Sequence, residues 1–340
     1  MTRSAAARGA AGGPYPGGGR RNGWWTVRRW TVRRWTVLVP AVLVTSLLTV
    51  GLAAAPSQAQ ATVCTGSLTG ITVSGDLEVP PGEACVLTNV GVPGAATVGA
   101  GADLFVIESN ISGALTVGSS AFAQVTESTL STRASLVDAF GLLLEGSTVS
   151  AGVDINGGLF FSTGTNVSST IVSNNGWTFI ESGQISGDIT TSHDQATDLV
   201  DVSMSGFLRV DSASTGSVVC RSSISGLLQV TSSSGLIQVG GTAPAPDCGS
   251  NVVNGEIRLE GNQADQIVVA NNLLFGNLNC LGNTPAPTGS GNMVNGSATG
   301  QCAGFGGSSA LQQLPLAGPD VQPDRRQAIL EVLAERADLG

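Results

Sequence analysis

One stretch of the chain gathers side chains that could act on a polysaccharide. A lyase or a glycoside hydrolase needs a pair of carboxylates, or a base held beside calcium, on one outer surface. Charged residues return further along the chain at Arg258 and Glu260, and Arg258 shares its position in the repeat described below with Arg209. The side chains that could build the centre of such a site are Asp188, His193, Asp194, Asp198, Asp201, Arg209 and Asp211.

Two observations weigh against an enzyme. His193 is the only histidine, and it lies in a polar segment of the kind that forms a solvated corner. Sugar-binding platforms need exposed Trp or Tyr, whereas Trp177 is the only such residue beyond the first 61 positions. The sequence also contains no nucleophile elbow, phosphate-binding loop, metal motif or dinucleotide fingerprint. We therefore expect no catalytic residue, no cofactor and no metal site.

The cysteines suggest a different chemistry, the formation of disulfide bonds. An even number of cysteines in an exported protein is typical of a disulfide framework, and six allow fifteen pairings. No two of them have the short spacing of a zinc site. Proximity in the sequence favours the pairs Cys64–Cys85, Cys220–Cys248 and Cys280–Cys302.

The amino-terminal segment has the three parts of a secretory signal peptide. Eight of the 15 basic residues, all of them arginines, lie in the first 34 positions. An apolar run over 35–52 follows, and Ala59 and Ala61 place small residues where signal peptidase cleaves. A membrane anchor is the alternative, but Pro40 interrupts the run and no basic cluster follows it. We predict a signal peptide over residues 1–61, and therefore a secreted, extracellular protein.

Removal of this leader would leave an acidic protein. All 24 acidic residues lie at or beyond Asp76, against seven remaining arginines, so the mature chain carries a formal charge of −17. Phosphate backbones and anionic lipids are poor partners for such a surface. We therefore expect no nucleic acid partner and no membrane partner after cleavage. A cell-wall glycan and self-association are the partners left open.

A short motif recurs along residues 62–302 and decides the fold class. It reads apolar, small polar, Gly or another small residue, any residue, apolar, as in Ile111-Ser112-Gly113-Ala114-Leu115. Successive copies are 18 to 21 residues apart, except for one step of 29 residues. Such regular spacing indicates a repeat protein. The small residue in the middle of the copies is Gly75, Gly94, Gly113, Thr132, Ala151, Ser169, Gly187, Gly206, Gly226, Gly255, Gly276 or Gly296.

Apolar and polar residues alternate inside each copy, which indicates short strands with one buried face. A repeat of about 19 residues cannot bury its apolar side alone, but stacked repeats line a shared interior. The sequence therefore predicts an all-β fold, a single-stranded parallel β-helix of about 12 coils with at least two strands in each. A leucine-rich repeat would need helical returns, which are missing. We expect Ile111, Leu208 and Leu228 to face the interior.

Departures from the repeat predict loops and fastened ends. The 29-residue step contains an insertion over 240–250 whose prolines cannot donate to a strand ladder, so it should leave the wall. The first and last cysteine pairs would fasten the end coils, where open strand edges invite aggregation. Asn251, Asn272 and Asn292 share one position in the repeat, which predicts a stacked column of asparagines.

The repeat pattern stops after residue 302. For residues 303–340 we predict a Gly/Pro-rich linker followed by a short C-terminal helix. The helix would cover residues 323–337 and carry Ile329, Leu330 and Leu333 on one face. This helix either caps an end of the solenoid or frays.

The repeat region resembles the bactofilins, β-helical proteins that polymerise end to end. The leader and the cysteines depart from the bactofilin pattern. The segment Asn277-Leu278-Asn279-Cys280-Leu281-Gly282-Asn283-Thr284-Pro285-Ala286-Pro287, closing at Gly300-Gln301-Cys302, resembles the ending of uncharacterised secreted actinobacterial β-helix repeat proteins. This resemblance implies a fold and an extracellular location, and no established activity.

Three classes of function are compatible with this fold. We favour a secreted structural, cell-surface or extracellular-matrix protein without a catalytic site, because the solenoid itself would then be the product. The first alternative is a polysaccharide lyase or glycoside hydrolase. The second is an ice- or surface-binding solenoid, suggested by one outward row that reads Thr129, Ser131, Thr148, Ser150, Asn166, Ser168, Gln184, Ser186, Ser203, Ser205, Ser223 and Ser225.

Overall fold

The computed structural model describes residues 60–245, 248–306, 327, 329–333 and 336. All of them belong to one compact unit over Pro56–Gly340. The predicted signal peptide lies outside the described residues except for its last two positions. The predicted linker is described up to Gly306, and the predicted C-terminal helix at seven positions.

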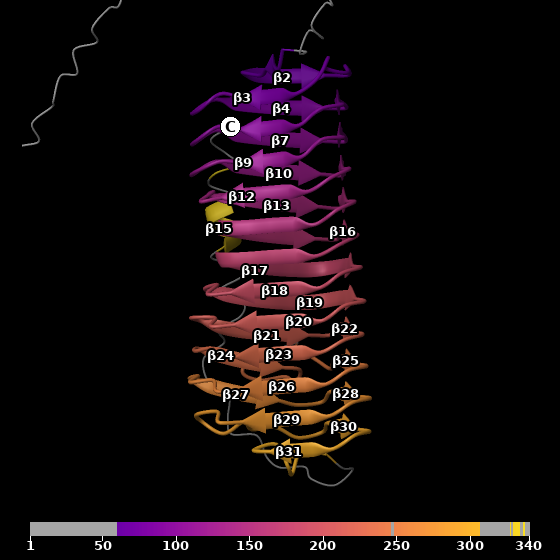
Figure 1. The fold of residues 1–340 in the computed structure, drawn as a ribbon, viewed down its shortest axis with the longest axis vertical. Helices are drawn as coiled ribbons and strands as arrows, with labels where there is room; N and C mark the ends of the chain where they lie inside the picture. The colour runs from indigo at the N-terminus through magenta and orange to yellow at the C-terminus, as the bar shows by residue number, and fades with distance from the viewer. Residues whose placement is uncertain (1–59, 246–247, 307–326, 328, 334–335, 337–340) are drawn as a thin grey trace, which may run out of the picture. The chain divides into compact units, whose positions relative to one another are not determined.

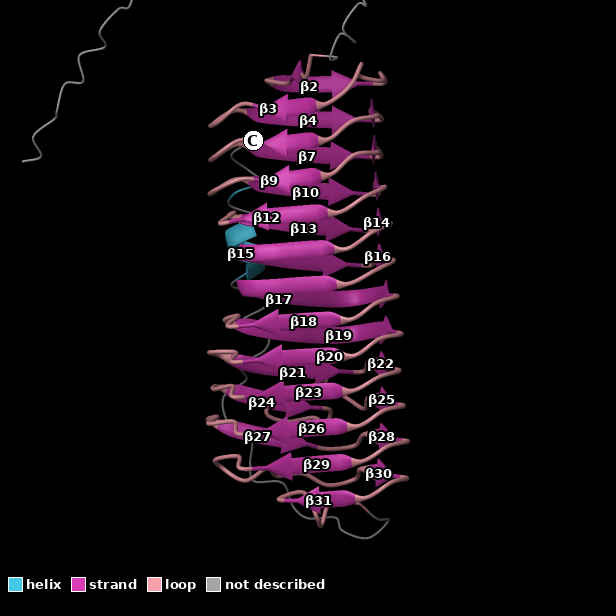
Figure 2. Ribbon diagram, in the orientation of Figure 1, coloured by secondary structure: helices cyan, strands magenta, loops and turns pink. Residues whose placement is uncertain are grey.

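The described chain winds into a parallel β-helix, as predicted. Its strands form one sheet of 31 strands, and the named strand pairs are parallel, each strand pairing with its equivalents in the coils before and after it. The coils therefore stack along one axis, with about 12 turns spaced by about 19 residues (Figure 1). Most turns hold three short strands rather than the minimum of two, and Figure 2 shows how loops join them at the corners. The three strands define three walls, here named faces 1, 2 and 3.

Face 1 begins two residues after the small residue of the motif. Its strands alternate inward apolar residues with outward polar ones, as Leu115, Thr116 and Val117 do in β9. The strands that lie wholly on face 1 are β1 (Thr62–Val63), β3 (Leu77–Val79), β6 (Ala96–Val98), β9 (Leu115–Val117), β12 (Ala134–Val137), β18 (Ile189–Ser192), β20 (Leu208–Asp211), β23 (Leu228–Thr231), β26 (Ile257–Glu260), β29 (Leu278–Leu281) and β31 (Ala298–Gly300).

Face 2 follows the next corner, and its outward positions are more apolar than those of face 1. In β7, Leu104 and Val106 are fully buried in the interior, whereas Phe105 lies between them on the outside. The strands that lie wholly on face 2 are β2 (Gly66–Thr69), β4 (Ala84–Thr88), β7 (Asp103–Ile107), β10 (Phe122–Thr126), β13 (Gly141–Glu145), β21 (Gly216–Cys220), β24 (Leu236–Val239) and β27 (Gln266–Val269).

Face 3 contains the first apolar residue of the motif. The strands that lie wholly on this face are two residues long. In β8, Asn110 is exposed and Ile111 is buried. The strands that lie wholly on face 3 are β5 (Gly91–Val92), β8 (Asn110–Ile111), β11 (Thr129–Leu130), β14 (Thr148–Val149), β16 (Asn166–Val167), β22 (Ser223–Ile224), β25 (Val252–Val253), β28 (Leu273–Leu274) and β30 (Met293–Val294).

Three longer strands in the middle of the stack continue from one face to the next. The pairing of Val153 with Ile171 shows that the coil shortens to 18 residues here, which leaves fewer residues for a corner. The continuous strands are β15 (Val153–Thr163) on faces 1 and 2, β17 (Ile171–Ile185) on all three faces, and β19 (Ala196–Met204) on faces 2 and 3.

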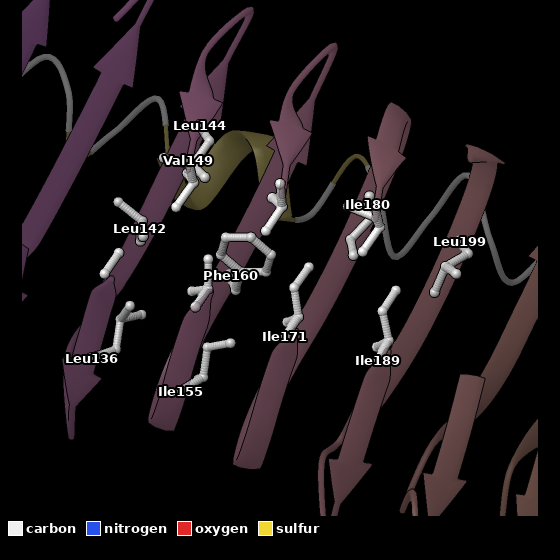
Figure 3. Packing of buried hydrophobic residues seen from close by; sticks show 14 of the residues in the cluster. Leu136, Leu142, Leu144, Val149, Ile155, Phe160, Ile171, Ile180, Ile189 and Leu199 are labelled. Atoms are coloured by element: carbon white, nitrogen blue, oxygen red, sulfur yellow. The ribbon is translucent and has the colours of Figure 1, made fainter. Parts of the chain in front are cut away.

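The interior of the coils is the main hydrophobic core. Ile111, Leu208 and Leu228 each have 0% of their surface exposed, which confirms the predicted inward positions. Phe160 is also fully buried and lies among aliphatic side chains contributed by neighbouring coils, as Figure 3 shows. One core therefore runs through the stack, since each coil covers the apolar residues of the next.

The predicted column of asparagines is present at the corner between faces 2 and 3. The side-chain amide of Asn251 donates to Asn272 at 3.0 Å, and that of Asn272 donates to Asn292 at 3.0 Å. Asn272 also donates to the carbonyl of Val239 at 2.8 Å. All three asparagines are at most 1% exposed, so their polar groups are satisfied without water. The column thereby fixes the register of the last coils.

Two further columns were not anticipated from the sequence. At the same corner in earlier coils, the Ser128 hydroxyl accepts from the backbone N–H of Ser109 at 2.9 Å, and Ser147 repeats this contact with Ser128 at 3.1 Å. At the corner between faces 1 and 2, the Asn262 amide donates to Asn283 at 2.8 Å, and Asn283 donates to Gln301 at 3.1 Å. The signal was present as polar residues recurring at the spacing of the repeat.

The three disulfides join the cysteines as predicted from proximity. Cys64–Cys85 and Cys280–Cys302 lie in the interior, at the first and the last described coils. Cys220–Cys248 lies outside face 2, in a small cluster with Val218, Leu236 and Ala245. It holds the insertion over 240–250, which leaves the strand ladder and folds back over face 2, where Ala245 donates to Gln238 at 2.8 Å.

Candidate functional site

The structure disperses the acidic residues that the sequence suggested as a site. Asp194 is fully buried at the corner between faces 1 and 2. Its Oδ1 accepts from the Ser173 hydroxyl and from the Gly176 backbone N–H, both at 2.9 Å, and its Oδ2 accepts from the Thr178 hydroxyl at 3.0 Å. This carboxylate therefore holds neighbouring coils together, and no substrate can reach it.

Burial sets the ionisation of this carboxylate. Loss of solvent raises the pKa of Asp194 above its usual value, and the N–H of Gly176 and the hydroxyls of Ser173 and Thr178 offset only part of the increase. Since the folded chain binds the proton more readily than the unfolded chain, stability falls as the pH rises from the unfolded pKa through the raised one.

We expect the substitution Asp194→Asn to abolish this pH dependence. The amide oxygen would still accept from Ser173 and Gly176, and the Thr178 hydroxyl would accept from the new amide nitrogen. Asp194→Ala, by contrast, should cost about 1–3 kcal/mol at any pH, because the buried N–H of Gly176 loses its acceptor. Denaturant unfolding of the three proteins between about pH 4 and pH 7 is the measurement. An unchanged pH profile in the Asn variant would contradict the assignment.

Two other acids of the group also bind a backbone N–H of the adjacent coil. Asp188 accepts from Phe207 at 3.0 Å, and Asp198, which is 1% exposed, accepts from Val218 at 2.8 Å. Asp201 lies at the corner between faces 2 and 3 and pairs with Arg221 at 2.8 Å. The hydrogen bonds from Arg221 lower the pKa of Asp201. The acids closest in sequence thus point to different sides of the coil.

The remaining charged candidates lie on face 1. Arg209 donates to Gln229 at 3.3 Å, and its guanidinium lies 5.5 Å from the Phe207 ring. Asp211 accepts from Thr231 at 2.9 Å. The shared register of Arg209, Gln229 and Arg258 is confirmed by the pairing of β20, β23 and β26. Arg258 contacts two carboxylates of its own coil, Glu256 at 3.1 Å and Glu260 at 3.6 Å. Arg209 and Asp211 thus both bind side chains of β23 in the next coil.

His193 occupies a solvated corner, as its sequence context predicted. It has a positive φ of 55°, and its Nδ1 lies 2.8 Å from the Ser192 hydroxyl. In the part of the chain that the structure describes, no three His, Cys, Asp or Glu residues are placed to hold a metal ion.

A hollow of about 540 Å³ lies near the amino-terminal end of the stack, several coils away from these residues. It opens at the corner between faces 2 and 3, near the first coils, and Asn89, Glu108 and Glu127 are among its lining residues. These three residues are stacked at one corner position, each with a positive φ between 48° and 55°. None of the charged residues suggested from the sequence lines this hollow, so it does not unite them into a site.

Face 3 carries the predicted outward row. Thr129, Thr148 and Asn166 are aligned by strand pairing and their side chains point outward, and the row continues through Gln184 and Ser203 to Ser223. In the next coil Val252 takes the same place, so the hydroxyl and amide row ends there. The row is regular, as the surface-binding alternative requires, but the amides of Asn166 and Gln184 interrupt the hydroxyl pattern.

Face 2 carries a feature that the sequence did not reveal, an apolar cluster on the outside of the wall. We name this cluster the aromatic strip. It consists of Phe105, Phe122, Phe140, Leu143, Leu159, Phe161, Trp177, Phe179 and Ala196. The rings contact one another. Phe161 stacks on Phe179 with ring centroids 6.4 Å apart, and Trp177 also stacks on Phe179, with ring centroids 6.4 Å apart. The signal in the sequence was a run of large apolar residues at positions that alternate with the inward ones.

The C-terminal helix covers the aromatic strip. The chain is helical at each described position of 327–336, and Ile329 and Leu333 are buried in the same cluster as the strip, with Leu330 partly buried beside them. The predicted apolar face of the helix is therefore confirmed. The sequence left two alternatives for this helix, an end cap or a frayed segment. Both are wrong, because the helix packs along the wall of face 2 (Figure 1).

Comparisons of the chain with family models, with curated proteins and with solved structures found no match. Within the residues that the structure describes, no helix is long and apolar enough to span a membrane. The resemblances to bactofilins and to secreted repeat proteins stay predictions, and the function must be argued from the walls, corners and ends of the β-helix.

Proposed function

We propose that the mature chain is a secreted structural or cell-surface protein whose product is the β-helix itself. The observation that carries this proposal is the way in which the candidate acidic residues are hydrogen-bonded. Asp188, Asp194 and Asp198 each accept a backbone N–H from an adjacent coil. An enzyme of this architecture needs carboxylates that face a substrate, whereas in a structural rod buried carboxylates can instead join one coil to the next.

The ends of the rod support the same proposal. A parallel β-helix exposes unpaired backbone groups at both ends, which makes the terminal coils the weakest. Here the first and last described coils each carry a disulfide in the interior. Such bonds persist in oxidising compartments, so they agree with the predicted export of the chain.

One preparation tests both the location and the absence of catalysis. The full-length chain, expressed with its leader in a bacterial host, should be recovered from the culture medium with the mass of residues 62–340. This protein should release no product from a broad panel of polysaccharides, and Arg209→Ala should leave its unfolding unchanged, because partly exposed pairs contribute little.

Two results would contradict the proposal. Retention of the chain inside the cell would remove the extracellular role. Cleavage of any glycan, lost in a folded Arg209→Ala protein and kept in Arg133→Ala, would establish an enzyme. Arg133 is a suitable control, since it is likewise exposed on the outside and pairs only with Asp154 among the described residues.

A further inference from the structure

The aromatic strip is a second core that the interior of the coils does not need. Six of the ten aromatic residues beyond position 61 lie in it, although aromatics are only 4% of the chain. Phe161 is 3% exposed and Phe179 is 5% exposed, while Trp177 stays partly exposed beside them. The interior cluster is continuous without these residues. Large apolar side chains gathered outside a complete core indicate a surface that binds something.

The C-terminal helix binds this surface through one face. Ile329 and Leu333, four residues apart, are 7% and 2% exposed, and Arg336 follows three residues later on the same side. This is the pattern by which an amphipathic helix lies in an apolar groove. Between the helix and the last described coil the sequence has the twenty residues 307–326.

Arg336 fixes the position and direction of the helix on the strip. Its Nε donates to Asp103 at 2.9 Å and its Nη2 donates to the carbonyl of Gly101 at 3.2 Å. The guanidinium also lies 5.5 Å from the centre of the Phe140 ring. Both Arg336 and Asp103 are largely withdrawn from solvent, at 25% and 13% exposed. The helix therefore binds specifically, with an apolar anchor and a charged one.

We infer that the helix and the aromatic strip form a transferable latch, in which the helix of one copy binds the strip of a second copy. Every described contact is between the helix side chains and the strip, its flanking carbonyls or Asp103. None of these contacts requires that the two partners share one chain. Exchange of an identical element is a low-cost route to association, because the second copy offers the same aromatic strip.

Concentration decides which copy is bound. A helix tethered to its own strip has an effective concentration there that depends on the length of the connection and is in the millimolar range for short flexible linkers. Dilute chains should therefore close on themselves, and crowded chains should exchange helices. Reciprocal exchange gives a closed pair, whereas one-way exchange links rods into chains. The inference deepens the proposed structural function, since it names the partner of the rod as a second copy of itself.

Shortening the connection tests the latch in the mature chain. Deleting residues 307–322 leaves four residues, whose five links span at most about 17 Å. About five coils separate Phe179 from Thr288, which corresponds to about 24 Å at the strand spacing. The shortened chain cannot place its helix on its own strip, so we expect it to form dimers or larger assemblies, an increase in mass of at least about two-fold in light scattering. A chain with sixteen Gly/Ser residues in place of 307–322 should stay monomeric at the same dilution.

A second substitution separates the latch from other kinds of association. Adding Leu333→Asp to the shortened chain should return it to a monomer, because a carboxylate cannot enter the apolar strip. Trp177, the only tryptophan of the mature chain, reports the strip directly, so its fluorescence should match the wild type in the assembly and shift in the Leu333→Asp monomer. A shortened chain that is monomeric, or that associates despite Leu333→Asp, would overturn the latch. Either result would leave the proposed structural function untouched, since that depends on export and on the absence of catalysis.

Discussion

Replacing Phe160 with alanine is expected to lower the free energy of unfolding by about 3–5 kcal/mol. Phe160 is 0% exposed and is among the largest side chains of the interior. Its strand, β15, pairs with β13 on one side and with β17 on the other. The wall therefore cannot collapse into the cavity that the substitution would leave. Because each coil is stabilised by its neighbours, the loss should weaken the middle of the stack. Guanidinium unfolding followed by far-UV circular dichroism measures this change.

Phe161 provides the matched control, since it is the next residue and points to the opposite side of the wall. It is 3% exposed, but its neighbours are the aromatic strip and the C-terminal helix. Phe161→Ala should cost less, about 1–3 kcal/mol, and should shift the fluorescence of Trp177 because the helix loses part of the aromatic strip that it contacts. Equal losses for the two variants, with no change in fluorescence, would show that the strip is not a separate layer.

Removing the last disulfide should destabilise the terminal coils by about 3 kcal/mol. Cys280 and Cys302 are 22 residues apart, and their bond closes the coil that contains β31. Replacing both by serine frees this coil from the stack, so the amides of β29 and β31 should exchange hydrogen much faster. Exchange measured by mass spectrometry resolves these strands from the rest of the molecule.

The pair Cys220 and Cys248 is the control for this prediction. Its bond lies outside face 2 and holds the insertion over 240–250, not a coil. Replacing it by serine should increase exchange in the insertion and leave β29 and β31 protected. If the two disulfide variants lost protection in the same segments, the terminal role of Cys280–Cys302 would be wrong.

The interior could be predicted because it depends on local alternation alone. In the sequence Leu115-Thr116-Val117 the two apolar residues must lie on one side of a strand, and the constant spacing of the motif stacks that side on its copies. The disulfides were predicted from proximity in the sequence alone, and the two that lie in the interior join residues 21 and 22 apart, about one coil. Ile111, Leu208 and Leu228 were placed correctly by this reasoning.

The candidate site could not be predicted in the same way. Asp194 and Asp198 are four residues apart, yet one lies at a corner facing Ser173 and the other on the outside of face 2. The sequence shows that several acidic residues are close to one another along the chain. The corners of the coil, however, turn their side chains to different sides. Their partners, Gly176 and Val218, come from adjacent coils and carry no signal of their own.

The sequence of this protein determined the coil, its interior and its asparagine column, because each follows from a period in the chain, and it determined the disulfides because each joins cysteines that are close in the sequence. The tertiary structure alone decided the roles of the acids and the place of the C-terminal helix. Arg336 meets Asp103 across 233 residues, and no periodicity relates them. A contact between an aperiodic segment and the outside of a periodic wall depends on which surface is left apolar and accessible, and that is settled only when the coils are stacked.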